Sequence, residues 1–474
     1  MRGLTPLTVA GAKRRTEALL LAFVVLITVG GHASVGLSMT GHLPDNISGF
    51  AVSMTLLALV GHLAVRRFAA YADPLILPLT LLLSGIGLVL LARLDTTYVE
   101  RWPKAGVTAP NQLMWTVVGA AICIGVLMAL RDHRLLQRFI YITMLVALVL
   151  LIAPIFFGAD MYGAKRWITI GGQSLQPGEF VKIMIAVFFA GYLVMHRDSL
   201  SLTGRKVLGV RLPPMRQLGP LVTVWVVSLL VLVFERDLGT SLIFFGVFVV
   251  MLYVATERTS WIVCGLLMAA VGAFVVGSTE PHVKGRVAAW LNPLAIYLPE
   301  DQRPPGLISE QSAQALFSFG SGGMTGTGLG QGHPELIGFA GRSDFILTTV
   351  GEELGLAGVM VVLVLYALLA QRGLRMALGA RDPFGKLLAV GLASALALQV
   401  FVVAGGVTGL IPLTGKALPF LAKGGSSLVA NWIMVALMLR ISDSAERHRE
   451  ATAAPPPDPP LPGAQPPVPS PAGA

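Results

Sequence analysis

The sequence predicts an all-α polytopic membrane protein with about twelve transmembrane helices and one large extracytoplasmic loop. Of its 474 residues, 54% are hydrophobic and only 13% are charged, whereas a typical soluble domain carries about 25% charged residues. Apolar runs of roughly 18 or more residues recur along most of the chain, which is the signal of membrane-spanning helices. The weak alternating segments typical of a transmembrane β-barrel are not seen in the sequence.

Twelve apolar segments are expected to cross the membrane. They begin near Glu17, Ile47, Asp73, Gln112, Phe139, Pro177, Leu218, Leu238, Ser260, Phe345, Leu387 and Ser426. Only the polar residues 235–237 separate the segments at Leu218 and Leu238, so one kinked helix is an alternative to two spans there. The first segment is too long for the apolar core of a signal peptide and is expected to be retained.

The positions of lysine and arginine predict the orientation of these spans. With an even number of spans both termini lie on one side, and a cytoplasmic choice places most of the 35 basic residues inside, as the positive-inside rule requires. The net charge of +10 is therefore interpreted as a topology signal, and no nucleic-acid partner is expected.

The predicted spans divide the chain into six parts. These are a cytoplasmic N-terminus (1–16), N-terminal transmembrane helices (17–157), core helices (158–278), a large extracytoplasmic loop (279–344), C-terminal helices (345–442) and a disordered, proline-rich cytoplasmic tail (443–474). The tail is assigned as disordered because its composition offers little apolar surface to bury.

Glu179 and Lys182 lie near the outer end of a predicted span, where charged residues are rare. They are three residues apart, so on a helix they share a face and can pair. An ionised group at the membrane centre costs roughly 2.5–3.5 kcal/mol on insertion scales. Two interpretations remain open: a structural ion pair, or part of a polar cavity that opens to the outer side.

Other ionisable residues lie at the outer ends of further spans. Asp237 lies in the polar break at 235–237, where a solvated turn would also account for it. Glu352 and Glu353 are expected about two helical turns into the next span, and at least one should face the bundle interior. Lys416 and Lys423 in the last outer loop suit a phosphate or pyrophosphate as point charges, and contact with lipid headgroups is the alternative.

The glycine run at 320–332 is a further candidate for phosphate binding. Successive backbone N–H groups in such a run could cradle phosphate oxygens. The run lacks the closing Gly-Lys-Ser/Thr of a P-loop. No spacing of residues in the sequence predicts a metal site.

Six motifs in order resemble the SEDS family (shape, elongation, division and sporulation), which includes RodA and FtsW. They are "GAKRWITIGGQSLQPGEFVK", "ERDLGTS", "GRVAAWLNP", "SGGMTGTGLGQG", "SDFILTTVGEELGLAG" and "GLIPLTGKALPFLAKGGSS", spread over about residues 160–435. The resemblance implies a ten-helix core. The GAKRW loop follows the fifth predicted span rather than the third, so two helices are added at the N-terminus. This extension and the tail favour the RodA branch of high-GC Gram-positive bacteria.

The resemblance implies an activity and its partners. A SEDS protein is a peptidoglycan glycosyltransferase that polymerises lipid II on the outer face of the bacterial cytoplasmic membrane, in cell elongation or division. The implied partners are lipid II, a class B penicillin-binding protein with transpeptidase activity, and membrane lipids. A lipid II flippase or transporter and a non-catalytic scaffold for a transpeptidase are the alternatives.

The resemblance also implies site residues. The catalytic acid of the family is expected in the large loop after the Asn-Pro step, where Asp301 is the best match and Glu300 is adjacent. The loop here is longer than usual and lacks the ordinary Asp-Pro-x-Gly. The residues implied to bind substrate are Arg166, Glu179, Lys182, Asp237, Asp344, Glu352 and Lys416.

The mechanism implied by the resemblance needs a base and a group of cations. A positioned base contributes about 10²–10⁴-fold to rate, and Asp301 is expected to take the proton of the acceptor hydroxyl. Arg166, Lys182 and Lys416 would stabilise the charge on the departing pyrophosphate. A divalent cation could share that role.

Overall fold

Long helices dominate the computed structural model, which describes residues 6–102, 106–161, 164–200, 206–207, 210–211, 218–235, 237–303 and 310–453. Eleven helices in these ranges are long and apolar enough to cross a membrane. They are α1 (Pro6–Thr40), α2 (Ile47–Phe68), α3 (Ile76–Arg101), α4 (Ala109–Ala129), α5 (Ile140–Phe157), α6 (Pro177–Leu200), α8 (Leu238–Thr256), α9 (Ser260–Thr279), α13 (Gly355–Gly379), α14 (Pro383–Val407) and α15 (Gly425–Ala453). The predicted polytopic helical fold is confirmed.

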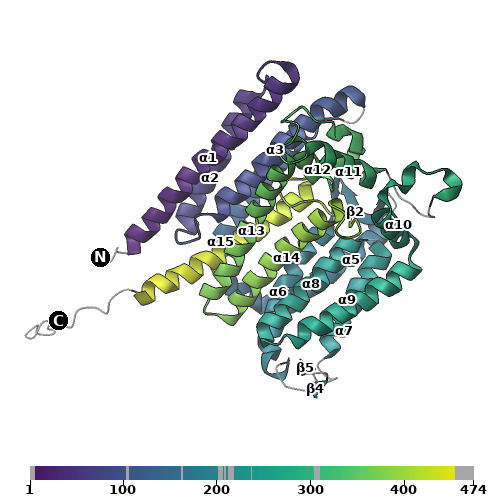
Figure 1. Cartoon of the computed structure of the whole chain (residues 1–474). Coiled ribbons are helices and arrows are strands. Elements are labelled where there is room, and N and C mark those ends of the chain that lie inside the picture. Colours follow the sequence, from purple (N-terminus) through teal and green to yellow (C-terminus); the bar gives the residue numbers. More distant parts are fainter. Residues whose placement is uncertain are drawn as a thin grey trace, which may run out of the picture.

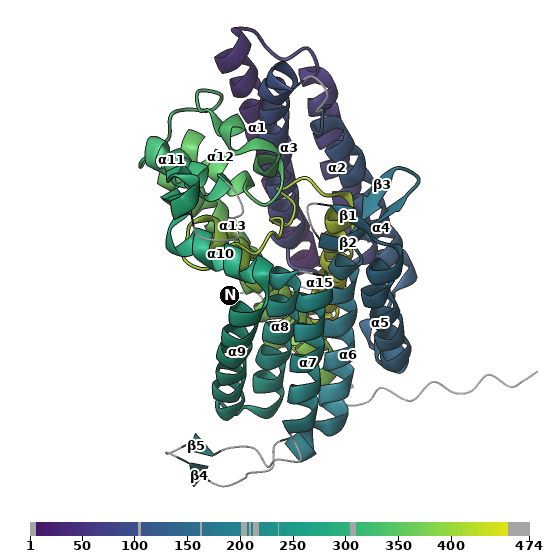
Figure 2. The same cartoon turned by 90° about the vertical axis from the view of Figure 1, so that its right-hand side faces the viewer.

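A further apolar helix, α7 (Leu218–Glu235), packs beside α8. Figure 2 shows the two helices side by side. They are therefore two separate helices, and the alternative of one kinked helix is wrong. With α7, the helices agree with the twelve predicted spans.

Shorter elements join the long helices. The helical ones are η2 (His133–Phe139), α10 (Pro281–Leu291), η4 (Pro293–Tyr297), η5 (Glu300–Gln302), α11 (Gln311–Gly322), η6 (Pro334–Arg342) and α12 (Ile346–Glu353). The strands are β1 (Ala159–Met161), β2 (Ala164–Ile170), β3 (Gln173–Leu175), β4 (Lys206–Val207) and β5 (Val210–Arg211). In Figure 2, α10–α12 and β1–β3 lie toward one end of the bundle and β4–β5 lie at the other.

Residues 164–167 of the GAKRW segment lie in strand β2 of a small antiparallel sheet, which an all-α prediction did not anticipate. Ile170 pairs with Gln173 across a two-residue turn, and both turn residues, Gly171 and Gly172, have positive φ angles of 59° and 79°. A two-residue hairpin turn with both central residues at positive φ strongly favours glycine. The β-branched residues of "WITI" then favour extended backbone.

The span expected to start near Phe345 is divided in the structure. A short helix, α12, ends at Glu353, and the spanning helix α13 begins at Gly355. Gly355 has a φ of +67°, and a Cβ there would lie 2.3 Å from the backbone nitrogen of Gly326. The glycine-rich loop therefore approaches too closely for a continuous helix, and Glu352 ends up before the span rather than inside it.

The boundaries at both ends of the chain also differ from the prediction. Helix α1 begins at Pro6, so much of the predicted N-terminal segment is helical. Helix α15 continues to Ala453, so the assignment of 443–453 to a disordered tail is wrong. Asp443 anchors this extension because it accepts a hydrogen bond from the backbone of Tyr71 and pairs with Arg447. The proline-rich remainder, 454–474, lies outside the described residues.

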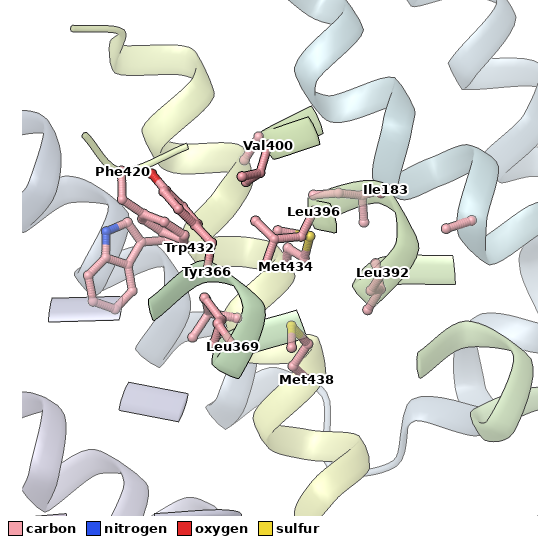
Figure 3. Packing of buried hydrophobic residues seen from close by; sticks show 14 of the residues in the cluster. Ile183, Tyr366, Leu369, Leu392, Leu396, Val400, Phe420, Trp432, Met434 and Met438 are labelled. Carbon is pink, nitrogen blue, oxygen red and sulfur yellow. The ribbon is translucent and has the colours of Figure 1, made fainter. Parts of the chain in front are cut away.

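The packed centre of the molecule is formed by α3, α14 and α15, each with 83% of its most apolar stretch buried, against 28% for α1, α2 and α4. Figure 1 shows α13, α14 and α15 adjacent in the middle of the bundle. In Figure 3, Leu396 and Val400 of α14 face Trp432 and Met434 of α15.

Candidate functional site

A polar cavity of about 1170 Å³ opens among the loops and short elements at the end of the bundle that carries α10–α12. Strands β2 and β3, helices α10 and α11, η6 and the loop between α14 and α15 contribute to its wall. The ionisable residues in the described lining are Arg166, Arg286, Arg342, Lys423 and Asp344. Four cations and one acid give this cavity a positive potential suited to an anionic ligand.

Glu179 and Lys182 form a buried pair at the start of α6. The Lys182 Nζ lies 2.8 Å from the Glu179 Oε2 and donates to the side chains of Gln399 and Asn431 at 2.7 and 2.8 Å. The Ser427 hydroxyl donates to Glu179 at 3.0 Å. Each charge therefore has several polar partners, which is the condition for burying ions.

Lys416 links this pair to Asp237. Its Nζ lies 3.4 Å from the Glu179 Oε1 and 3.2 Å from the Asp237 Oδ2. Asp237 also caps the N-terminus of α8, where it accepts hydrogen bonds from the backbone and hydroxyl of Thr240. A side chain that satisfies the first N–H groups of a helix is held in one orientation.

The charge partners of Asp237 decide its ionisation. Burial acts to raise the pKa of this carboxyl, but Lys416 and Arg166, together with the hydrogen bonds of Thr240, outweigh burial and lower the pKa to about 2. Asp237 and Glu179 in turn raise the pKa of Lys416 above its ordinary value, although burial opposes them. The pair is therefore ionised at neutral pH.

Arg166 connects the buried charges to the cavity. Its Nη1 lies 3.9 Å from the Asp237 Oδ2, and its guanidinium lies over the Trp167 ring at 4.2 Å. The buried Nε and Nη1 atoms have no hydrogen-bond partner among the described residues. An unpaired buried donor is costly, so these atoms are suited to an anion entering the cavity.

Arg286 and Asp344 lie on the cavity wall near Arg166. Arg286 of α10 donates to the carbonyl oxygens of Leu413 and Thr414 at 3.2 and 3.0 Å. Burial raises the pKa of Asp344, against hydrogen bonds and the charges of Arg166 and Arg286. Burial also lowers the pKa of Arg286.

The structure does not bring Glu352 into the cavity. Its carboxylate accepts a hydrogen bond from the backbone of His333 at 2.6 Å, and neighbouring Glu353 accepts one from the backbone of Gly330 at 3.0 Å. These carboxylates therefore bind backbone N–H groups of the glycine-rich loop. The expectation that those groups cradle a phosphate is not supported, because α12 supplies their acceptors.

Asp301 and Glu300 lie on η5, and both side chains are exposed. Neither is among the residues that line the cavity, although Pro293, shortly before them, is. The catalytic role expected for Asp301 therefore stays a prediction.

Two cavity cations, Arg286 and Arg342, were not singled out from the sequence, whereas Lys423 was considered there together with Lys416 as a phosphate ligand. All three lie in or beside the motifs that carry the family resemblance. Arg342 pairs with Asp95 of α3 at 3.0 Å and lies over the Tyr98 ring. A charged pair between α3 and the large loop was not visible from sequence, since nothing in the spacing links Asp95 to residue 342.

Within the described ranges, no group of three or more histidine, cysteine, aspartate or glutamate residues lies close enough to hold a metal ion. Asp344 is the one carboxylate in the described lining of the cavity. Mg²⁺ is usually bound through one or two carboxylates together with substrate phosphates. The cavity therefore suits a divalent cation that enters together with a phosphorylated ligand better than a cation that the protein alone would hold.

Comparisons with known proteins place these features in a family. The model of the FtsW, RodA and SpoVE family, described as cell cycle proteins, matches residues 73–447. The chain is 44% identical over 436 residues to the peptidoglycan glycosyltransferase RodA of Mycobacterium leprae, covering 92% of this chain and 91% of that protein. It is 33% identical to a probable peptidoglycan glycosyltransferase FtsW of Trichlorobacter lovleyi, with 79% and 94% covered.

A solved structure shows the same fold. A chain from a study of how a peptidoglycan synthase complex coordinates polymerization and crosslinking matches with a TM-score of 0.55 and 25% identity. The match covers 75% of this chain and 96% of that chain. This match leaves about a quarter of the present chain uncovered, which is long enough to include additional helices.

Proposed function

The chain belongs to the FtsW, RodA and SpoVE family of cell cycle proteins, and we propose that it polymerises lipid II as a peptidoglycan glycosyltransferase. The similarity to enzymes of that activity extends over 92% of the chain. The observation that carries the substrate class is the cavity whose described lining contains four cations and one acid. The greater identity to RodA than to FtsW relatives favours a role in cell elongation.

The cavity cations are proposed to bind the diphosphate of the glycan donor. Arg166 has two buried nitrogen atoms without hydrogen-bond partners, and Arg286 and Lys423 lie on the same lining. Guanidinium groups match phosphate oxygens in a bidentate geometry. When the glycosidic bond forms, negative charge gathers on the departing diphosphate, and fixed cations stabilise that transition state.

Glu179, Lys182, Asp237 and Lys416 would serve the reaction by positioning. They are nearly inaccessible to solvent, so contact with a large substrate is not their role in this arrangement. Their network holds the start of α6, the turn before α8 and the last outer loop together. Arg166 then rests against Asp237, and its free donors face a preorganised site.

Asp301 is proposed as the base that accepts the proton of the attacking sugar hydroxyl. Its exposure on η5 leaves the carboxylate accessible to an acceptor chain arriving from outside the bundle. A base must come within about 2.6–3.2 Å of the proton it removes, and such contacts often tighten only with substrate bound. Glu300 is the alternative base.

Asp344 would be the residue of the described cavity lining that holds a divalent cation arriving with the diphosphate. The chemistry of this cation would be to neutralise charge on the phosphate oxygens. The arginines and Lys423 supply the same kind of stabilisation from the protein, so a cation would add to them.

The topology proposed for this activity places both termini in the cytoplasm and the cavity on the extracytoplasmic face of a bacterial cytoplasmic membrane. The distribution of basic residues supports this orientation. A class B penicillin-binding transpeptidase is the proposed partner. The similarity to a chain of a peptidoglycan synthase complex supports a partner that crosslinks the product.

The proposal is tested by polymerisation of labelled lipid II by the purified full-length protein, with its co-purifying transpeptidase, reconstituted in liposomes. Glycan chains from the wild type, and none from a preparation of the Asp301→Ala variant, are expected. Translocation of lipid II across the vesicles without polymer would instead establish a flippase. Full complementation of cell shape by a variant inactive in polymerisation would instead establish a scaffold.

A further inference from the structure

A second cavity, of about 480 Å³, lies at the opposite end of the bundle from the polar cavity. The C-terminal ends of α2 and α4 and the later part of α15 form it. Arg67, Arg131, Arg440, Arg447 and His448 are its basic lining residues. None of these basic residues lines the polar cavity described above.

The two acids in this lining are already engaged. Asp443 accepts a hydrogen bond from the backbone of Tyr71 and pairs with Arg447 at 2.8 Å. Asp132 accepts one from the backbone of Arg134. Among the described residues, no ion pair with an acid is seen for Arg67 or Arg131. The cavity therefore has a surplus of positive charge.

Arg440 brings to the cavity wall a buried donor that has no hydrogen-bond partner in the described part of the chain. It is 6% exposed and donates to the backbone carbonyl groups of Phe68 and Leu127. Its buried Nε has no hydrogen-bond partner among the described residues. The nearest acid, Asp443, lies 3.7 Å from its Nη1. A buried guanidinium with an unused donor favours an anion beside it.

Three apolar residues, Phe68, Leu127 and Met128, also line the cavity. On α2, one and two turns before the cavity, Leu63 and Leu59 are exposed by 52% and 50%. Arg440 lies roughly 22 Å along α15 from its start at Gly425, at 1.5 Å per residue. In a helix that starts at one boundary of a hydrocarbon core about 30 Å thick, this length places Arg440 in the far half of that core.

We infer that this cavity binds the phosphate headgroup of an anionic phospholipid in the cytoplasmic leaflet. The arginines would bind the phosphate oxygens, and Phe68, Leu127 and Met128 would contact the glycerol and the first acyl carbons. Basic pockets between helices on the cytoplasmic side are suited to such headgroups. The choice of leaflet rests on the topology proposed above, whereas the site itself does not depend on the polymerase activity.

The inferred lipid site would depend on the N-terminal helices. Arg67 and Phe68 belong to α2, which precedes the residues 73–447 matched by the family model. A lipid bound between α2, α4 and α15 would therefore stabilise the packing of the N-terminal helices against the core. Few protein contacts join α2 to that core, since only 28% of its most apolar stretch is buried.

The test is native mass spectrometry of the full-length protein in detergent, titrated with phosphatidylglycerol. The variant Arg67→Gln/Arg131→Gln removes two exposed arginines from the cavity, while Arg66→Gln/Arg375→Gln removes two exposed arginines that line neither cavity. A basic residue near an anionic surface contributes about fivefold in affinity, so we expect about 25-fold weaker binding for the first variant. The control variant should bind like the wild type.

Three results would overturn the inference. Equal losses in the two variants would show general attraction to surface charge. Binding of phosphatidylcholine as tight as that of phosphatidylglycerol would remove the requirement for an anionic headgroup. Competition by inorganic phosphate or glycerol phosphate at the concentration of the lipid would identify a free phosphate as the ligand, because the apolar half of the cavity would then contribute nothing.

Discussion

The Nζ of Lys416 and the Oδ2 of Asp237 lie 3.2 Å apart, with 3% and 1% of their side chains exposed. Lys416 comes from the loop between α14 and α15, and Asp237 from the turn between α7 and α8. The same Lys416 Nζ lies 3.4 Å from Glu179 of α6. One buried ammonium therefore holds three distant parts of the chain together at the base of the outer cavity.

Breaking this pair should destabilise the protein. The Lys416→Met variant leaves the Asp237 carboxylate without its main charge partner, which should lower the free energy of unfolding by about 3–5 kcal/mol. Denaturant unfolding in detergent measures this change. Lys284→Met, which removes an exposed lysine of α10, should have an effect within about 0.5 kcal/mol. Equal stability of the two variants would contradict the assigned role of the pair.

The contribution of Asp237 should depend on pH in a defined direction. Its folded pKa of about 2 lies below the ordinary value of 3.8. A lowered carboxyl pKa stabilises the folded state fully above the unfolded pKa, and this stability is lost as the pH falls toward the folded pKa. The melting temperature of Asp237→Asn should therefore lie below that of the wild type by a constant amount above about pH 5. This difference should shrink between pH 4 and 2. A deficit independent of pH across that window would argue against an ionised Asp237.

Removal of a cavity arginine should weaken catalysis more than folding. Arg166→Gln and Arg286→Gln each remove hydrogen bonds to a charged ligand, which contribute about 1.5–3 kcal/mol. This corresponds to a loss of about 10- to 100-fold in kcat/KM for lipid II. Lys284→Gln provides a matched loss of positive charge on α10 outside the cavity lining. If that control loses as much activity, general electrostatic attraction rather than the cavity binds the donor.

The two acids of η5 can be separated by conservative substitution. Asp301→Asn should reduce polymerisation by about 10²–10⁴-fold, the contribution of a positioned base. The melting temperature should not change, because the side chain is exposed. Glu300→Gln should retain most of the activity. The opposite result would move the base to Glu300, and near-wild-type activity in both variants would place it elsewhere in the protein.

Several features of the site could be predicted because each carries a local signal. Charged residues at the ends of apolar runs are costly in a membrane, which singled out Glu179 and Lys182, whereas Asp237 and Lys416 were implied to bind substrate by the family motifs that contain them. The structure brings these four together with Arg166 in one network. The cost of placing a charge in a membrane and the order of motifs can both be seen in a sequence. These residues could therefore be found before their partners were known.

Other features depended on partners far away in the chain. Glu352 seemed a substrate ligand by its position, but its carboxylate accepts from the backbone of the glycine-rich loop. The pairing of Asp95 with Arg342 joins residues almost 250 positions apart, and neither residue type indicates the other. Hydrogen-bond acceptors and donors are assigned only when the chain is folded, since several groups could satisfy each of them.

The sequence by itself determined the membrane-spanning class, the approximate place of each span and the family, because hydropathy and motif order are properties of contiguous residues. Only the tertiary structure decided which charges are buried together, that α12 ends before α13, and that Arg166, Arg286 and Lys423 share one cavity. These outcomes arise from packing between distant segments. A buried charge is tolerated only where other parts of the chain supply its partners.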